Sequence, residues 1–401
     1  MAERPPGPIE GYFLSFNLYA LGNGLVAVFL NLFILADYSY LAVLDFQMAT
    51  YATALAAYLG CGYLLPRYRP KQLYLLGLAL FTLVLFALLA ASGVLAGPVV
   101  FGMLWGTATG VFYAGNNPMM HDITRSADRT SFVATNNLLT GAVSLIAPVS
   151  AGALIQFSNL SGTERYLWDF AVTAVFFLLA ALVIRRVRDD APPGPPFSLS
   201  RVLRAPGPRY RRFQLCFAAS QLFAIPLGIV LPIYIFEATG SYLVTGVYAS
   251  FTVALSVGAN LGFRRGFRPG SRFAPAAVAG IIASSLLLFL PVERLAAAFL
   301  FAGIYTVLAT PLNNWVMVEF MDRIDAHGDL DRATVWSNRE FYLGVGRIFV
   351  LGTMIALSLL LIRDSGDLVY LLPAFSLYSL TYLGLPHTPP GGPRPATART
   401  A

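Results

Sequence analysis

Long apolar stretches almost free of charge are the feature that most limits what this chain can fold into. They recur along its 401 residues, and most reach or approach the roughly 18 residues that cross a bilayer as a helix. Only 12% of the residues are charged, about half of the roughly 25% that is usual in soluble domains. The sequence therefore predicts an all-α integral membrane protein.

The apolar stretches predict twelve transmembrane helices, six on each side of a central linker. Residues 185–211, rich in Pro, Gly and Arg, form a predicted linker between residues 1–184 and residues 212–401. Within the linker, residues 197–203 have the pattern of a short amphipathic turn at the membrane surface. We place the spans at 11–36, 41–65, 73–92, 96–121, 130–156, 166–184, 212–238, 242–262, 274–291, 295–318, 334–362 and 368–385.

Lys and Arg residues are distributed unequally between alternate loops. With the N-terminus in the cytoplasm, about 22 of the 27 fall on the cytoplasmic side, where such residues concentrate. Only Arg165, Arg294 and Arg363 fall in outer loops. This asymmetry predicts that both termini face the cytoplasm of a multi-pass inner (cytoplasmic) membrane protein. It also accounts for the net charge of +7 without a nucleic-acid partner.

An internal repeat relates the two halves of the chain. Residues Asp128–Gly141 align without gaps on Asp331–Gly344, and Ser39–Leu41 recurs as Ser241–Leu243. These matches stand in the same order, about 200 residues apart, at equivalent loops. Because parallel repeats of six helices are a recurrent transporter plan, we expect two pseudo-symmetric six-helix bundles.

Over essentially its full length, the chain resembles the major facilitator superfamily. Its loop after the second span is similar to the family signature G-x-x-x-D-R-x-G-x-[RK], with matches at Gly62, Arg67 and Lys71. Pro66 and Arg69 stand where the signature has its aspartate and second glycine. The resemblance implies the two-bundle fold and transport by alternating access, in which the bundles rock about a central site.

The fifth span carries a second family pattern. Residues 147–152, Ala-Pro-Val-Ser-Ala-Gly, are similar to the G-P-x-x-G-G signature that is found mainly in exporters. Its proline and small residues favour a kinked helix that can approach a neighbour closely. The pattern therefore favours export, although two of the glycines are alanine here.

These patterns favour a monomeric secondary active transporter that exports a drug-like or amphipathic small molecule in exchange for protons. A lipid or glycolipid flippase on the same fold and a non-transporting membrane scaffold are the alternatives. ATP-driven transport is disfavoured, because the single lysine, Lys71, follows Pro70 and so leaves no phosphate-binding loop. An enzyme is disfavoured, because the sequence has no nucleophile elbow and no Cys/His arrangement. His121, His327 and His387 are far apart, so we expect no metal site, and no cofactor is implied.

The eleventh predicted span carries charges that a membrane helix rarely tolerates without a function. Arg347 lies about 13 residues into the span, roughly 20 Å along the helix. Glu340 lies seven residues earlier, almost on the same helical face. One hypothesis is that Arg347 contacts an anionic or polar substrate and that Glu340 is its proton-sensitive partner. A structural pair that locks helix packing is equally compatible with the pattern.

Amide side chains form a second candidate group. Asn23 and Gln221 lie within the first and seventh spans, and the repeat places Asn137 opposite Glu340. Because amides both donate and accept hydrogen bonds, we predict these three residues as substrate contacts, with interhelical hydrogen bonding as the alternative. For the pairs Asn116–Asn117 and Asn313–Asn314, the structural role is favoured.

Carboxylates within the spans are scarce, and proton coupling requires one. Asp45 is the best candidate besides Glu340, whereas Asp169 and Glu237 fall near outer ends and favour a structural or solvated role. Charged residues in the cytoplasmic loops are predicted to form gating networks that hold the inner halves together. The predicted gating residues are Arg67, Lys71, Asp128, Arg129, Asp331 and Arg332.

Overall fold

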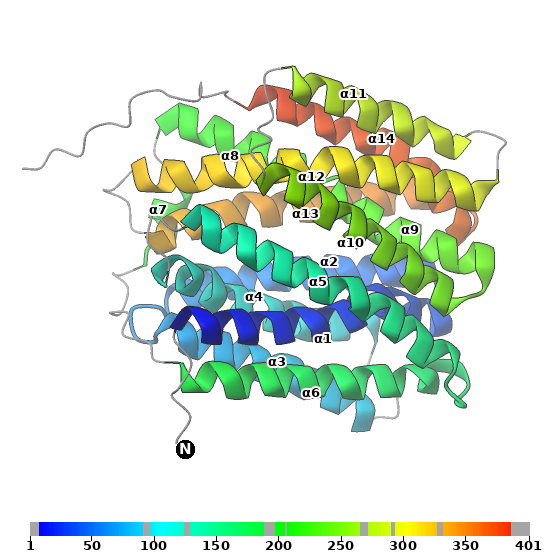
Figure 1. The fold of residues 1–401 in the computed structure, drawn as a ribbon, viewed down its shortest axis with the longest axis horizontal. Coiled ribbons are helices and arrows are strands. Elements are labelled where there is room, and N and C mark those ends of the chain that lie inside the picture. Colours follow the sequence, from blue (N-terminus) through cyan, green and yellow to red (C-terminus); the bar gives the residue numbers. More distant parts are fainter. Residues whose placement is uncertain are drawn as a thin grey trace, which may run out of the picture.

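The structure is a computed structural model that describes residues 8–90, 97–123, 129–187, 197–204, 207–264, 272–289, 293–326 and 332–385. Every regular element in these ranges is a helix (Figure 1). The elements of the first half are α1 (Pro8–Asp37), α2 (Tyr40–Gly62), α3 (Pro70–Ala90), α4 (Pro98–Asp122), α5 (Arg129–Gln156), η1 (Gly162–Tyr166) and α6 (Leu167–Arg186).

The linker contributes one short helix, α7 (Leu199–Leu203). The elements of the second half are α8 (Gly207–Gln221), α9 (Ala224–Thr239), α10 (Tyr242–Arg264), α11 (Phe273–Ser285), η2 (Leu286–Phe289), α12 (Arg294–Ala326), α13 (Arg332–Leu361), η3 (Ser365–Leu371), α14 (Leu372–Ser376) and η4 (Leu377–Gly384). The helices agree with the predicted spans to within a few residues over most of the chain.

Three predicted spans are not continuous α-helices. The ninth consists of α11 followed by the 3-10 helix η2. The seventh is divided into α8 and α9 at Leu222–Phe223. Pro226 accounts for the break, because a proline ring clashes with the carbonyl of the fourth residue before it, here Leu222. The twelfth consists of η3, α14 and η4 in succession, with Pro373 at the start of α14. Periodicity and hydropathy gave no sign of these irregularities.

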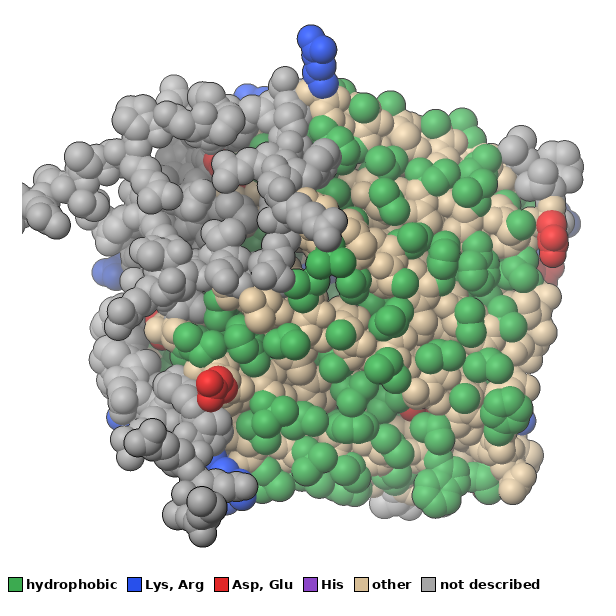
Figure 2. Space-filling view, in the orientation of Figure 1, with side chains coloured by type: hydrophobic (Ala, Val, Ile, Leu, Met, Phe, Trp, Pro, Cys, Tyr) green, Lys and Arg blue, Asp and Glu red, His purple; other side chains and the backbone are tan. Residues whose placement is uncertain are grey.

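The surface is suited to lipid. Within the described ranges, eight helices are long and apolar enough to cross a membrane. Figure 2 shows a face dominated by hydrophobic side chains, and large ones such as Phe157 and Leu360 are 73% and 79% exposed. In a soluble protein, such wide apolar exposure would drive aggregation. The structure therefore supports a multi-pass membrane protein.

The helices pack mainly within two sets. In the N-terminal set, α1 packs against α5 and α6, α2 against α4, and α3 against α4 and α6. In the C-terminal set, α8 packs against η4, α10 against α12, and α11 against α12 and η4. Figure 1 shows α1, α3 and α6 on one side of the molecule and α11, α12 and α14 on the other. Helix pairs α2–α13 and α5–α10 make the main contacts between the two sets.

The α2–α13 seam is an antiparallel contact along both helices. At one end, the hydroxyl of Tyr40 donates to the carbonyl of Ile362 at 3.3 Å. Farther along, Gly344 lies directly against the side chain of Leu55. A methyl group on Gly344 would stand 2.9 Å from that leucine side chain, which is closer than normal packing allows. Because Gly344 has no side chain, α2 and α13 can approach each other closely at this point.

The α5–α10 seam depends on the small-residue pattern of the fifth predicted span. A methyl group on Gly246 of α10 would lie 2.3 Å from the carbonyl oxygen of Pro148. One on Gly152 of α5 would lie 2.5 Å from the carbonyl oxygen of Tyr242. Neither backbone can move away without separating the helices. The predicted close approach is confirmed, and α10 is the helix that makes it.

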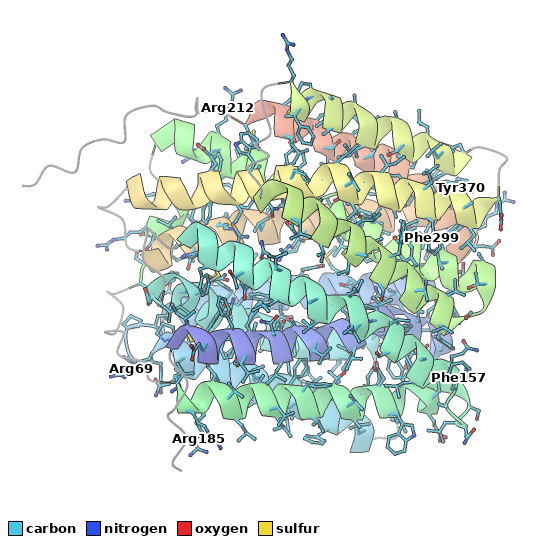
Figure 3. The ribbon with its side chains drawn as sticks, in the orientation of Figure 1. Arg69, Phe157, Arg185, Arg212, Phe299 and Tyr370 are labelled. Atoms are coloured by element: carbon cyan, nitrogen blue, oxygen red, sulfur yellow. The ribbon has the colours of Figure 1, made fainter. Side chains whose placement is uncertain are left out.

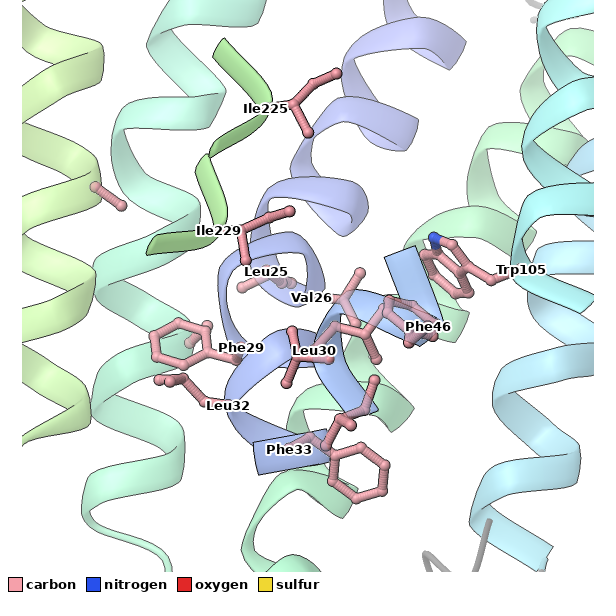
Figure 4. Packing of buried hydrophobic residues seen from close by; sticks show 14 of the residues in the cluster. Leu25, Val26, Phe29, Leu30, Leu32, Phe33, Phe46, Trp105, Ile225 and Ile229 are labelled. Atoms are coloured by element: carbon pink, nitrogen blue, oxygen red, sulfur yellow. The ribbon is translucent and has the colours of Figure 1, made fainter. Parts of the chain in front are cut away.

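The first helix contacts both sets. Figure 4 shows Leu25 of α1 near Ile229 of α9, whereas Val26 and Leu30 point toward Phe46 of α2. All five side chains are buried in one hydrophobic cluster. The cluster therefore extends from the N-terminal set into the helix that follows the break at Leu222–Phe223.

The repeated serines begin equivalent helices. The Ser39 hydroxyl accepts from the backbone N–H of Ala42 at 3.4 Å, and the Ser241 hydroxyl accepts from that of Val244 at 3.2 Å. A serine at this place satisfies an N–H that the first helical turn leaves unpaired. The second repeat also begins equivalent helices, because α5 starts at Arg129 and α13 at Arg332, each following the repeated aspartate.

The two ends of the molecule differ. We call the end near Gly62 and α7 the linker end, and the end near Tyr40, Gln156 and Tyr242 the distal end. At the linker end, the Phe197 ring covers Gly62, where an added methyl group would lie 2.6 Å from the ring. Val202 of α7 is fully buried, and its carbonyl accepts from Asn338 of α13. The predicted turn in the linker thus contacts protein on both sides.

Candidate functional site

Arg347 lies near the middle of α13, facing α2 across the seam. Its guanidinium stands over the ring of Tyr51, 5.2 Å from the ring centre, and its side chain is half-buried. Such a cation–π contact stabilises by about 0.5–2 kcal/mol. An aromatic ring offers no acceptor to the N–H groups of the guanidinium, so the ring alone does not satisfy them.

Tyrosines from two further helices adjoin this contact. Tyr113 of α4 interacts electrostatically with Arg347, Glu340 and Tyr51. Its hydroxyl also interacts with that of Tyr19 on α1. Helices α1, α2, α4 and α13 therefore bring three tyrosines and one arginine together near their midpoints. We call Tyr19, Tyr51, Tyr113 and Arg347 the tyrosine–arginine cluster.

Glu340 forms an ion pair with Arg339, its neighbour in sequence. The Nη1 of Arg339 lies 2.5 Å from Oε1 of Glu340, and the two side chains are only 14% and 15% exposed. The sequence hypothesis had paired Glu340 with Arg347. Glu340 and Arg347 are separated by two helical turns, about 10 Å, whereas the guanidinium of Arg339 contacts Glu340 directly.

Three aromatic rings hold Arg339 in place. Its guanidinium carbon is 5.3 Å from the ring centre of Phe217, 5.5 Å from that of Phe320 and 5.3 Å from that of Trp336. The rings belong to α8, α12 and α13, so this aromatic cage lies within the C-terminal set. Sequence reasoning missed the cage because its members are spread over more than 100 residues.

The ion pair reaches the other set of helices through Tyr58 of α2. That tyrosine interacts electrostatically with both Glu340 and Arg339. Its hydroxyl accepts a hydrogen bond from the amide of Asn117 at 3.4 Å. The carboxylate of Glu340 on α13 therefore interacts across the seam with a tyrosine of α2.

The paired asparagines connect helices, as the structural reading predicted. Asn116 accepts from the hydroxyl of Tyr12 at 3.0 Å and so joins α4 to α1. Its counterpart Asn313 accepts from the amide of Gln221 at 2.8 Å and from the hydroxyl of Tyr382. The second members act alike, because Asn117 bonds to Tyr58 and Asn314 bonds to Asn260.

The other predicted substrate amides are distributed over the molecule. Gln221 ends α8 at the break in the seventh span, where its amide is held by Asn313. Asn23 of α1 and Asn137 of α5 are half-buried and make no side-chain hydrogen bond to described residues. Their amides are available to a ligand, whereas that of Gln221 already has a protein partner.

Asp169 is the most deeply buried acid in the described ranges. Its side chain is 0% exposed, and neither carboxylate oxygen has a hydrogen-bond partner. It lies in the first turn of α6, beside Tyr166, whose ring meets that of Tyr242 at 5.6 Å. The sequence placed Asp169 near an outer end, and its complete burial was not foreseen.

Asp45 and Glu237, the other acids considered, are exposed. Glu237 accepts a hydrogen bond from Ser365, which joins α9 to η3 at the distal end. Asp45 lies on the distal half of α2, about 9 Å along the helix from Tyr51. In the described parts of the chain, no three His, Cys, Asp or Glu residues are grouped as metal ligands would be.

Comparison with known proteins identifies the family. The sequence profile described as the Major Facilitator Superfamily matches residues 12–327. The chain belongs to the major facilitator superfamily. Its fold is also similar to the crystal structure of a variant of the E. coli fucose:proton symporter FucP, with a TM-score of 0.63 and 16% sequence identity. That match covers 95% of this chain and 99% of the symporter. No curated protein matches the chain by sequence.

Superfamily members are transporters. Two of the predicted gating residues, Arg67 and Lys71, stand in the loop after the second helix, where the family has its signature. Lys71 donates to the carbonyls of Arg185 and Val187, and so satisfies the C-terminal end of α6. Arg67 is exposed. Figure 3 shows Arg69 and Arg185 at the linker end. Asp128 and Asp331, two further predicted gating residues, fall outside the described residues. Arg129 and Arg332 are the first residues of α5 and α13, and their side chains also fall outside what the structure describes.

Proposed function

We propose that residues 1–184 and 212–401 are two six-helix bundles joined by the linker 185–211, giving twelve spans. The N-terminal and C-terminal sets would be these bundles. The linker end would face the cytoplasm, together with both termini, because Lys and Arg concentrate there. Eight long apolar spans, in which α8 and α9 count as one, support this arrangement. Helices α2 and α4 would supply two more spans, and the segments α11–η2 and η3–α14–η4 would supply the last two.

The protein would transport by alternating access, as a monomer in the inner membrane. The α2–α13 and α5–α10 seams would serve as the surfaces on which the bundles rock. Their glycines support this role, because close backbone contact with few interlocking side chains lets helices slide past one another. Substrate would bind between the bundles at Arg347, Asn23, Asn137 and Gln221.

We infer that transport is coupled to protons through Glu340. The observation that carries this inference is the position of its carboxylate, held by Arg339 in one set and facing Tyr58 of the other. Protonation would remove the negative charge that faces both residues. The seam could then open at the linker end while Arg339 stayed in its aromatic cage. Asp45 would be a second, more exposed proton site.

The proposed activity is proton-coupled export of a drug-like or amphipathic molecule, and one further observation supports the proton coupling and another the export. The fold is similar to that of a protein named as a proton symporter. The exporter-like pattern at residues 147–152 forms the tight contact with α10. Arg67, Lys71, Asp128, Arg129, Asp331 and Arg332 would then gate the cytoplasmic side, with Lys71 acting through the end of α6.

The test uses purified protein in proteoliposomes that contain a pH-sensitive dye. A panel of anionic, neutral and cationic amphipathic compounds is added, with and without an imposed pH gradient. We expect at least one compound to move protons in wild-type vesicles. Glu340→Gln should still exchange labelled substrate across the membrane but should no longer move protons, because a neutral amide cannot titrate. Asp45→Asn is the matched control and should reduce proton movement less.

Two results would contradict the proposal. If no compound moves protons in wild-type vesicles, proton coupling is wrong. If Glu340→Gln moves protons as well as the wild type, the coupling group lies elsewhere.

A further inference from the structure

Arg347 is the one charge of the mid-span region that the described residues do not neutralise. Its guanidinium makes no hydrogen bond and no ion pair to any of them, and its contact is with the ring of Tyr51, while Tyr113 interacts with it electrostatically. The cation–π contact orients the guanidinium but leaves its five N–H groups unused. An arginine fork between two helix sets is thus available to a ligand.

The nearby acids cannot serve as its partner. Glu340 is engaged by Arg339 at 2.5 Å. Asp45 is exposed about 9 Å farther along α2. Asp169 is enclosed in the first turn of α6, at the distal end. The tyrosine–arginine cluster therefore carries one net positive charge.

The rest of the cluster is aromatic. The ring of Tyr51 adjoins the guanidinium, Tyr113 of α4 interacts with it electrostatically, and Leu55 packs one turn away against Gly344. The amide of Asn117 is engaged by Tyr58, and that of Asn23, one helical turn from Tyr19, is the one amide near the cluster without a partner among described residues. A neutral sugar needs several amide or carboxylate partners for its hydroxyls, and the cluster does not supply them. A flat aromatic ring and one guanidinium, which can donate two parallel hydrogen bonds, suit a planar molecule with a single anionic group.

We propose that Arg347 binds the carboxylate of a monovalent organic acid whose flat, apolar body lies against Tyr51 and Tyr113. Both carboxylate oxygens would accept from the guanidinium, in the bidentate geometry that arginine favours. The acid would replace the missing counter-charge, and the tyrosine rings would cover its body. This inference rests on the proposed function, because it places the ligand where the two helix sets meet.

The arrangement has a consequence that separates binding from structure. An unpaired charge between helices destabilises the empty protein, so an apolar residue of similar length should be tolerated or preferred there. Arg347→Met should therefore unfold at the same temperature as the ligand-free wild type, or higher. An arginine that locks helix packing would give the opposite result, because its loss would lower the unfolding temperature.

The test measures thermal unfolding and ligand affinity of purified full-length protein in detergent. The probes are benzoate, its neutral analogue benzamide, acetate and a neutral monosaccharide. We expect benzoate to raise the unfolding temperature in a saturable manner. Benzamide, which lacks the charge, and acetate, which lacks the ring, should each bind at least about tenfold more weakly. The monosaccharide should have no effect.

Three variants complete the test. Arg347→Lys keeps the charge without the fork and should bind benzoate about tenfold more weakly, whereas Arg347→Met should bind it roughly 100-fold more weakly. Arg363→Ala removes an exposed arginine just beyond α13 and should leave benzoate affinity unchanged. Equal binding of benzoate and benzamide, or full benzoate affinity in Arg347→Met, would overturn the inference.

These results are separable from the proposed function. If benzoate does not bind but another compound moves protons in proteoliposomes, the substrate class is wrong and proton-coupled transport stands. If benzoate binds through Arg347 and no compound moves protons, the substrate class stands and the coupling proposal fails.

Discussion

Asn116 and Asn313 are structural counterparts in the two halves of the chain. Each uses its side-chain oxygen to accept a hydrogen bond from the first helix of its own half, from Tyr12 at 3.0 Å and from Gln221 at 2.8 Å. The repeat seen in sequence thus extends to a shared pattern of interhelical hydrogen bonds. These bonds hold each set of helices together.

Asn116→Ala and Asn313→Ala should each destabilise the protein. Removing the acceptor leaves a buried donor unsatisfied, at a cost of about 1–3 kcal/mol. Thermal unfolding in detergent would show the loss. Asn137→Ala is the control, because its half-buried amide has no hydrogen-bond partner among described residues, and it should unfold like the wild type. Equal losses in all three variants would contradict the distinction.

Gly246→Ala should disrupt the α5–α10 seam. The added methyl group would lie 2.3 Å from the carbonyl oxygen of Pro148, so one helix must move. We expect lower thermal stability and impaired transport in proteoliposomes. Gly258→Ala on the same helix meets open space and should instead stabilise the protein by up to about 1 kcal/mol, because alanine favours helix more than glycine does. A Gly246→Ala protein as stable and active as Gly258→Ala would show that the close contact is dispensable.

Asp169→Asn should be tolerated. Because neither oxygen of the buried carboxylate has a partner, a neutral side chain of the same shape removes a desolvation cost and breaks no bond. The variant should unfold at the wild-type temperature or above and should transport at the wild-type rate. Loss of transport in a stable Asp169→Asn protein would instead reveal a need for a titratable group at the distal end.

Trp336→Leu should release Arg339 from its cage. The guanidinium would lose one of three aromatic contacts, each worth about 0.5–2 kcal/mol, and the ring volume would be left empty. We expect lower stability and a changed pH dependence of transport, because Glu340 would lose a fixed partner. Phe341→Leu, which changes the next aromatic residue after the ion pair, should leave the pH dependence unchanged. The same shift in both variants would mean that the cage does not position Glu340.

The sequence was sufficient to predict where most of the helices lie and that the two halves of the chain are related. Hydropathy located the spans because a helix in lipid must be apolar along its whole length. It did not reveal the break at Leu222–Phe223, because Pro226 is tolerated in membrane helices and does not by itself specify a break.

The site was only partly predictable. Arg347 and Glu340 stood out because charges within spans are rare, but their actual neighbours could not be derived. Tyr51 contacts Arg347 only because α2 and α13 pack antiparallel, and that register depends on glycines such as Gly344. The caging of Arg339 likewise depends on three helices meeting, which no local pattern encodes.

The most direct test of alternating access is a pair of distance measurements between spin labels. One pair, at Tyr38 and Arg363, spans the α2–α13 seam at the distal end, and the other, at Tyr68 and Arg212, spans the linker end. All four positions are exposed. We expect opposite changes, so that conditions that lengthen the distal distance, such as a shift in pH or added substrate, shorten the other. Distances that stay fixed at both ends, or that lengthen together, would contradict the account.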